Sequence, residues 1–364
     1  MLVVDVAVPA HDRTGGGLRM TWLLRLFRSL GCEVTLFPTL PQEQREPYAT
    51  QLAQLGVEVH DNALDLSDFA AARAGLYDLV LLSSPAAAEH AVGPSREAFP
   101  DAAIVYDSVD LHFLRVARKG ELTGEPTEAD LWKAVELECI RGSDVVATVT
   151  ETEASVVRSL VPQTRTVVLP TVHEPDREPR LPHIQSSDLL FIGGFLHDPN
   201  IDAVRYFVGD VLPLVRTEID ARLWVIGPDP PDEIRALASP SVIVTGHVPR
   251  VDDHFRRARV FVAPLRYGAG MKGKIGHAMA YGLPVVTTAI GAEGMDLVDG
   301  EHALIREGAG DFASGVVALY RDATLWQRLS TRSQEIVHER WGPEAMRVRL
   351  DELLSAAARR PGMG

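Results

Sequence analysis

The stretch VFVAPLRYGAGMKGKIGHAMAYGLPVVTTAIGAEG, residues 260–294, decides the fold class of this chain. It begins with a short apolar run that ends at Pro264 and predicts a buried strand. A turn with Gly268 and Gly270 follows, and then a run of helical character. Pro284 lies beyond the end of that helix and opens a second short apolar run, which predicts the next strand. The pattern is therefore a strand, a glycine loop, a helix and another strand.

Two lysines, Lys272 and Lys274, fall in the first turn of the predicted helix. Lysines at this end oppose the helix dipole, which favours anions at the N-terminus. A bound diphosphate explains both features, because backbone amides and the dipole attract it and the two ammonium groups neutralise it. The alternative is that both lysines are solvated surface residues and that the glycines only make a turn.

The composition indicates a protein of two domains. The chain has 364 residues, of which 46% are hydrophobic, enough for two cores. Its net charge of −14 argues against nucleic-acid binding. Two distant cysteines, Cys32 and Cys139, indicate a reducing compartment. Asp5 interrupts the first apolar run, which reads as a strand and not as a signal peptide, and no apolar run is long enough for a transmembrane segment. We therefore expect a cytoplasmic protein.

Apolar runs alternate with helical stretches along the whole chain, which predicts α/β domains with parallel, doubly wound sheets. From residue 170 to 182 the sequence is polar, rich in proline and without periodicity, as in a linker. His173 and Glu174 fall in this linker, where we expect a solvated loop. The predicted organisation is a first domain over residues 1–170, a linker over 171–183, a second domain over 184–340 and a C-terminal helix over 341–364.

Three glycines, residues 15–17, follow the first predicted strand. A dinucleotide-binding fingerprint would need glycine where Met20 stands and an acidic residue where Pro38 stands, so NAD binding is not expected. Glycines at this place let the backbone approach a ligand without a Cβ in the way. Gly16 and Gly17 are therefore candidate binding residues, with a plain tight turn as the alternative.

Asp107, Asp110 and His112 lie in VYDSVDLHFLR, just beyond the fifth predicted strand. Ligands of open α/β sheets bind outside the carboxyl ends of the strands, so these side chains should face a crevice. An acceptor hydroxyl needs a proton acceptor or a hydrogen-bonding anchor, and carboxylate or imidazole supplies either. The three residues are candidate catalytic groups. The alternative is helix capping by one of the aspartates.

The deciding stretch resembles the nucleotide-sugar-binding signature of GT-B glycosyltransferases, in particular the family-4-like group with "group 1" C-terminal domains. The pattern P-x-x-x-G-x-G-x-K-x-K is matched from Pro264 to Lys274, and G-x-P-V-V-x-T is matched from Gly282 to Thr288. The N-terminal segments DRTGGGLRM and VYDSVDLHFLR resemble bacterial transferases of cell-surface polysaccharide pathways. The resemblance implies two Rossmann-like domains that face a central cleft, with the C-terminal helix returning to the first domain.

The resemblance also implies an activity. It is the transfer of a sugar from a nucleoside diphosphate sugar to a hydroxyl of a small-molecule or glycan acceptor, with retention of configuration. The D-x-D pair that metal-dependent GT-A transferases use does not occur in the sequence. We therefore expect a metal-independent reaction, without a cofactor, in which the helix dipole and the ammonium groups stabilise the leaving diphosphate. The alternatives are a nucleotide-sugar epimerase on the same fold and a catalytically silent binding partner.

Donor contacts are implied at further positions. Most relatives carry two glutamates where this chain has Ala269 and His277, and a cationic pair after the first glycine turn of the second domain, which is absent after Gly194. The donor phosphates must then be neutralised mainly by the two lysines of the deciding stretch. The implied donor-binding set is Gly16, Gly17, Gly193, Gly194, Val248, Arg266, Gly270, Met271, Lys272, Lys274 and His277, and no metal ligand is predicted.

Overall fold

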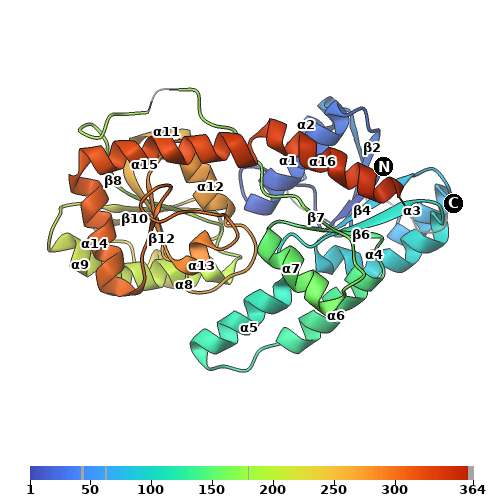
Figure 1. The fold of residues 1–364 in the computed structure, drawn as a ribbon, viewed down its shortest axis with the longest axis horizontal. Coiled ribbons are helices and arrows are strands. Elements are labelled where there is room, and N and C mark those ends of the chain that lie inside the picture. The colour runs from blue at the N-terminus through green and yellow to red at the C-terminus, as the bar shows by residue number, and fades with distance from the viewer. Residues whose placement is uncertain (42–44, 62–63, 179, 360–364) are drawn as a thin grey trace.

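The computed structural model describes residues 1–41, 45–61, 64–178 and 180–359. Within them the chain forms two lobes, each built on its own parallel β-sheet (Figure 1). The first lobe comprises β1–β7 with α1–α7, and the second comprises β8–β13 with α8–α15. The predicted architecture of two doubly wound parallel sheets is confirmed.

The first sheet has the strand order β3-β2-β1-β4-β5-β6-β7, with every pairing parallel. Its strands are β1 (Leu2–Asp5), β2 (Val34–Pro38), β3 (Val57–Val59), β4 (Leu79–Ser83), β5 (Ala103–Asp107), β6 (Val145–Thr148) and β7 (Thr166–Val168). Its helices are α1 (Gly15–Ser29), α2 (Tyr48–Gln54), α3 (Leu66–Ala72), α4 (Pro85–Ala98), α5 (His112–Thr123), α6 (Ala129–Arg141) and α7 (Glu151–Leu160). The order reverses between β1 and β4, which defines the switch point of this lobe.

The second sheet repeats this arrangement in the order β10-β9-β8-β11-β12-β13. Its strands are β8 (Ser187–Ile192), β9 (Leu223–Ile226), β10 (Val242–Gly246), β11 (Ala258–Ala263), β12 (Val285–Thr287) and β13 (Leu304–Ile305). Its helices are α8 (Asp198–Tyr206), α9 (Leu212–Arg216), α10 (Asp232–Arg235), α11 (Asp252–Arg257), α12 (Gly273–Ala280), α13 (Ala289–Ala292), α14 (Gly308–Arg321) and α15 (Ala323–Ile336), with a π-helical turn η1 (Phe207–Val211) between α8 and α9. Here the switch point lies between β8 and β11.

Each sheet is covered by an apolar core on both faces. Inward side chains of β1, β4 and β5 alternate between two clusters, as period-2 strands with both faces buried require. The second sheet is divided between two clusters in the same way. Both lobes are thus complete α/β layers, and the carboxyl ends of their strands remain available for ligands.

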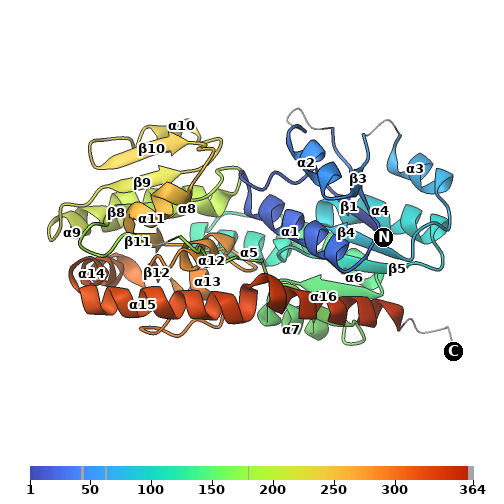
Figure 2. The same ribbon diagram turned by 90° about the horizontal axis from the view of Figure 1, so that it is seen from above.

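The C-terminal helix α16 (Pro343–Ala358) returns to the first lobe after a π-helical turn η2 (Val337–Trp341). Its apolar side chains Met346, Leu350 and Leu353 belong to a core cluster of the first lobe. Figure 2 shows α15 under the second lobe and α16 continuing under the first. Pro343 begins this helix at a position where its missing N–H costs nothing. Within the described residues, no helix is both long and apolar enough to span a membrane.

The linker differs from its expected solvated state at His173. The His173 side chain is only 3% exposed, and its backbone N–H donates to the carbonyl of Trp341 at 2.9 Å. Its ring lies on α12, where a Cβ on Gly276 would come within 2.4 Å of it. The polar composition of the linker predicted that His173 would be exposed to solvent. Instead, its ring packs on Gly276 of α12 and its backbone is hydrogen-bonded to Trp341. Glu174, the next residue, is not buried.

Helix α5 has no counterpart among the elements predicted from the sequence. It forms a hairpin with α6 that projects from the first lobe (Figure 1). None of its residues is fully buried, although Phe113 and Leu114 pack against a core cluster of the first lobe. It ends at Gly124, which has the left-handed φ of +73°.

Candidate functional site

The glycine loop between β11 and α12 is shaped by two glycines with positive φ. Gly268 has φ +154° and Gly270 has φ +67°, a conformation that strains residues with a Cβ. A Cβ on Gly270 would also lie 2.9 Å from the Cβ of Asp110 in the first lobe. The loop therefore brings the backbone of the second lobe against the segment after β5, just before α12 begins.

A second glycine turn, Gly193-Gly194, follows β8. A Cβ on Gly193 would lie 2.6 Å from Nδ2 of Asn200 and 2.9 Å from Nζ of Lys274. Asn200 stabilises the turn by donating from Nδ2 to the carbonyl of Gly194 at 2.6 Å. Because β8 and β11 are the neighbouring strands at which the order reverses, both glycine loops lie at the switch point, where open α/β sheets bind ligands.

Lys274 lies between these two loops. Its ammonium donates to Oδ1 of Asn200 and lies 4.7 Å from the ring centre of Phe191. Burial, followed by the charge of Lys272, lowers the pKa of Lys274 to about 7, because both favour the neutral amine. An anion bound beside Lys274 would stabilise the ammonium and reverse this shift.

The side chain of Lys272 has different partners from that of Lys274. It is 7% exposed, its Nζ donates to the carbonyl of Gly270 at 2.7 Å, and the same atom lies 3.8 Å from Oε2 of Glu293. Burial lowers the pKa of Lys272, although Glu293 and Glu153 oppose the shift. Lys272 thus closes the glycine loop. The sequence treated the two lysines as equivalent, whereas their surroundings differ.

Asp107 is fully buried at the end of β5. Arg19 of α1 donates Nη1 to its Oδ2 at 2.6 Å and Nη2 to its Oδ1 at 2.9 Å. Arg19 is itself only 3% exposed and also donates to the carbonyl of Leu169 at 3.0 Å. Both charges are matched inside the first lobe, which favours a structural role for Asp107 over contact with a substrate.

Asp110 and His112 form a different kind of pair. Oδ1 of Asp110 lies 2.9 Å from Nδ1 of His112, and its Oδ2 lies 3.2 Å from Nε of Arg115. Burial raises the pKa of Asp110, but the hydrogen bond and charge of His112 outweigh it and hold the pKa well below its ordinary value. Burial likewise lowers the pKa of His112, and Asp110 outweighs it, so that this pKa is raised. An ionised carboxylate that supports a basic imidazole suits proton transfer.

Helix α5 connects this pair to the second lobe. Arg118 donates from Nη1 and Nη2 to the carboxylate of Glu293, both at 2.7 Å, and from Nη1 to the carbonyl of Gly268 at 2.6 Å. Further contacts along the same helix join Arg115 to His197 and Lys119 to Asp198. The Asp110–His112 pair and the glycine loop before α12 are therefore held against each other by ion pairs and hydrogen bonds between the lobes.

Comparisons with known proteins bear on this geometry. Residues 186–322, which contain both glycine loops and both lysines, match the family model described as glycosyl transferases group 1. The second lobe is a group 1 glycosyl transferase domain. Among curated proteins, none matches the chain by sequence at a significant level.

Solved structures of similar fold match nearly the full length of this chain. Sucrose-phosphate synthase from Thermosynechococcus elongatus has a TM-score of 0.74 at 17% identity, covering 97% of this chain and 98% of that one. HepE from Anabaena, in complex with UDP and glucose, has a TM-score of 0.74 at 15% identity, covering 98% and 100%. The pneumococcal O-GlcNAc transferase GtfA, in complex with UDP and GlcNAc, has a TM-score of 0.75 at 10% identity, covering 99% of both. These likenesses confirm the GT-B fold of the chain, whose second lobe carries the family match.

The three glycines after β1 were expected in a turn before a helix, but they form the first turn of α1, where the side chain of Thr14 accepts from the backbone N–H of Gly17. A Cβ on Gly17 would lie 2.5 Å from the carbonyl oxygen of Ala10, so this helix start requires glycine there. Gly16 has open space around it. Nearby, Arg13 lies 3.6 Å from Asp229 of the second lobe, which places this turn at the seam between the lobes.

The remaining predicted donor residues lie at several places around α12. The Sδ of Met271 accepts from the backbone N–H of Thr171 at 3.4 Å, and Val248 packs against an apolar cluster. Arg266 pairs with Asp202, its Nε 2.9 Å from Oδ2. These three side chains have partners within the chain, and their contact with a donor stays a prediction.

His277 occupies the position of the second glutamate of most relatives. Its ring lies 4.6 Å from that of Phe255 and 5.5 Å from that of Tyr281. Burial lowers the pKa of His277 to about 4, so the ring is neutral at physiological pH. A neutral imidazole in an aromatic cluster therefore stands where the family resemblance implies a carboxylate.

Sequence reasoning missed three groups of the site, namely Asn200, Arg118 and Glu293. Asn200 and Lys274 are 74 residues apart, and Arg118 and Glu293 are 175 apart. Asn200 follows a proline at the start of α8 and belongs to no motif recognised in the sequence. Arg118 lies in α5, the helix that was not predicted. Asn200 meets Lys274 within the second lobe, whereas Arg118 meets Glu293 across the seam, so only the tertiary structure reveals these partners.

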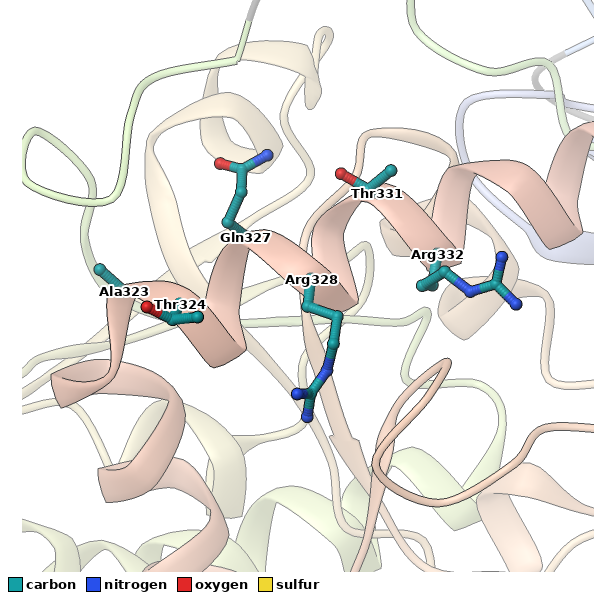
Figure 3. A pocket seen from close by; sticks show the side chains of 6 residues that line it. All are labelled: Ala323, Thr324, Gln327, Arg328, Thr331 and Arg332. Atoms are coloured by element: carbon teal, nitrogen blue, oxygen red, sulfur yellow. The ribbon is translucent and has the colours of Figure 1, made fainter.

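The protein also has a surface pocket along α15, away from the carboxyl edges of the sheets (Figure 3). One helix, α15, supplies its lining: Ala323, Thr324, Gln327, Arg328, Thr331 and Arg332. None of these residues belongs to the predicted site, so the pocket is not part of it. Among the described residues, no group of three or more His, Cys, Asp or Glu side chains is arranged to hold a metal ion.

Proposed function

We propose that the protein moves a sugar from a nucleoside diphosphate sugar to an acceptor hydroxyl at the seam between its lobes. The observation that carries this proposal is the meeting of two glycine loops and Lys274 at the switch point of the second lobe, opposite Asp110 and His112. The two relatives in complex with UDP and a sugar, HepE and GtfA, support the donor class.

In this proposal the diphosphate lies against the N-terminus of α12, between Gly193 and Lys274. The backbone N–H groups, the helix dipole and the ammonium of Lys274 stabilise the negative charge that develops on the leaving diphosphate. Lys272 holds the loop in shape from beneath. Positive charge is thus supplied by the chain itself, in line with the metal-independent reaction predicted from the sequence.

The acceptor is proposed to approach from the first lobe. The bond between the anomeric carbon and the diphosphate oxygen breaks, the bond to the acceptor oxygen forms, and the hydroxyl proton leaves to a base. Asp110 and His112 are the candidates to bind the hydroxyl and take up its proton. Retention of configuration is proposed from the family resemblance, and an anomeric NMR spectrum of the product tests it.

A ligand screen tests the proposal. Thermal unfolding is measured with UDP, GDP, ADP, TDP and CMP, because a ligand that binds only the folded state raises its apparent stability. We expect at least one nucleoside diphosphate to raise the Tm. Incubation with the matching donor alone, and then with donor and acceptor, separates the alternatives. An epimerase converts the donor without an acceptor, and a silent partner binds it without turnover.

A further inference from the structure

Two buried glutamates outside the predicted site hold the backbone at the start of α5. Glu136 of α6 accepts from the backbone N–H of His112 at 3.2 Å with Oε1 and from that of Phe113 at 2.9 Å with Oε2. Glu153 of α7 accepts from the backbone N–H of Leu111 at 2.9 Å. Three consecutive N–H groups, which a helix start leaves without partners, are thus bound by two carboxyls from two other helices.

These carboxyls are in an unfavourable place for a charge. Glu136 is 0% exposed and Glu153 is 3% exposed. Burial raises the pKa of Glu136 to about 7 and that of Glu153 to about 8. Their hydrogen bonds go mainly to this one stretch of backbone, with a longer contact of 3.4 Å from the hydroxyl of Tyr106 to Glu136.

The stretch that they hold carries the acceptor-side pair. His112 is fixed at its backbone N–H by Glu136, while its ring lies 5.2 Å from that of Trp132, also on α6. Phe113 and Leu114, at the start of α5, pack only partly buried against a core cluster of the first lobe, and the two glutamates bind the backbone N–H groups there. The glutamates supply the fixed point from which the Asp110 and His112 side chains extend.

We propose that Glu136 and Glu153 are positioning residues that fix Asp110 and His112 against the glycine loop of the second lobe. This inference rests on the proposed function, in which Asp110 and His112 face the acceptor. Neither glutamate touches the substrate. They act through the backbone of residues 111–113, so that the imidazole and the carboxylate keep their separation and direction.

NMR on the free protein tests the positioning without any substrate. The imidazole of His112, assigned with His112→Ala, is titrated in the wild type and in Glu136→Gln. The charged groups that act on this ring are Asp110, Arg115 and Glu136. Removing the charge of Glu136 should lower the pKa of His112 and shift its resonances.

The matched control is Glu138→Gln on the same helix, whose side chain is 77% exposed and pairs with Arg141. It should leave the titration of His112 unchanged. If Glu136→Gln does not fold, Glu153→Gln gives the second reading, with Glu151→Gln on the exposed face of α7 as its control. A His112 titration unchanged in a folded variant of either buried glutamate overturns the proposal.

Kinetics then separate positioning from stability alone. Glu136→Gln should lower kcat about tenfold, because small displacements of reacting groups are costly, and should leave the affinity for the donor unchanged. In a His112→Ala background the same substitution should have no further effect. Losses that multiply in the double variant would show that the glutamate acts independently of His112 and would overturn the proposal. If the wild type shows no turnover but Glu136→Gln still shifts the titration of His112, only the proposed function is contradicted.

Discussion

The carboxyl edges of the two sheets meet at the seam, but they are built from opposite chemistry. The edge of the first sheet carries buried carboxyls, among them Asp107 and Asp110, with partners that largely belong to the same lobe. The edge of the second sheet carries glycine turns and lysines, and Lys274 has the amide of Asn200 as its partner. The carboxylates of the first edge are thus paired with positive groups, whereas Lys274 at the second edge is hydrogen-bonded to a neutral amide.

This difference supports the proposed placement of the donor at the second edge and the acceptor at the first. An anionic diphosphate gains from amides, a helix start and an ammonium, which only the second edge provides. A neutral hydroxyl needs a group that accepts a proton, which the first edge provides. The predictions below test the contrast, beginning with the largest effect.

Replacing Asp107 by Ala should lower the free energy of unfolding by about 3–5 kcal/mol, because the guanidinium of Arg19 is left buried and unpaired. Chemical denaturation measures the loss. Asp110→Ala should cost much less stability, since its partners lie near the surface, but should reduce turnover. If Asp110→Ala destabilised the fold more than Asp107→Ala, the division between a structural and a functional aspartate would be wrong.

The proton on Glu153 should make stability depend on pH. Its pKa is raised in the folded state to about 8, while the unfolded chain releases the proton near its ordinary value of 4.5. The stabilisation by this proton is complete below pH 4.5 and is lost as pH rises to about 8. Relative to Glu153→Gln, the wild type should lose on the order of 5 kcal/mol over this range.

Urea denaturation of both proteins between pH 4.5 and 8.5 measures this difference, and the subtraction removes the titration of the buried histidines. A difference that is flat with pH, or that rises, would show that Glu153 is ionised in the folded state. The first edge would then hold more negative charge than the comparison assumes.

Replacing Lys274 by Ala should weaken binding of the donor nucleotide by about 2 kcal/mol, the loss expected for a charge-assisted contact. Because the pKa of Lys274 is lowered to about 7 in the free protein, binding of the anion at pH 7.5 should also take up a proton. Calorimetry in two buffers of different ionisation enthalpy detects this uptake. Lys133→Ala, on α6, is the control, and proton uptake that persists without Lys274 would assign it to another group.

Removing the interlobe contact of Arg118 should have the smallest effect. The pair with Glu293 is bidentate but about a quarter exposed on each side, so Arg118→Ala should cost about 1 kcal/mol of stability. A moderate rise in the KM for the donor should accompany it, since Arg118 also binds the carbonyl of Gly268. Arg141→Ala, which removes an exposed pair within α6, is the control.

The sequence indicated the glycine loops of the second lobe more clearly than the partners of the carboxylates in the first lobe. Glycines at Gly193 and Gly270 are required by close approach or by a positive φ, and such requirements leave a direct trace in the sequence. A carboxylate leaves no comparable trace of its partner. Asp107 and Asp110 looked equivalent, and only Arg19, 88 residues before Asp107, distinguishes them.

By itself, the sequence determined two doubly wound α/β lobes and the glycine loop with its lysine-bearing helix, because strand and helix periodicity and glycine conformation are local properties. The tertiary structure alone decided which lysine faces the glycine turn, that His173 is buried on Gly276, and that Glu136 and Glu153 bind the start of α5. Those outcomes depend on contacts between residues far apart in the chain. Their energy comes from burial and complementary charge, which no local pattern records.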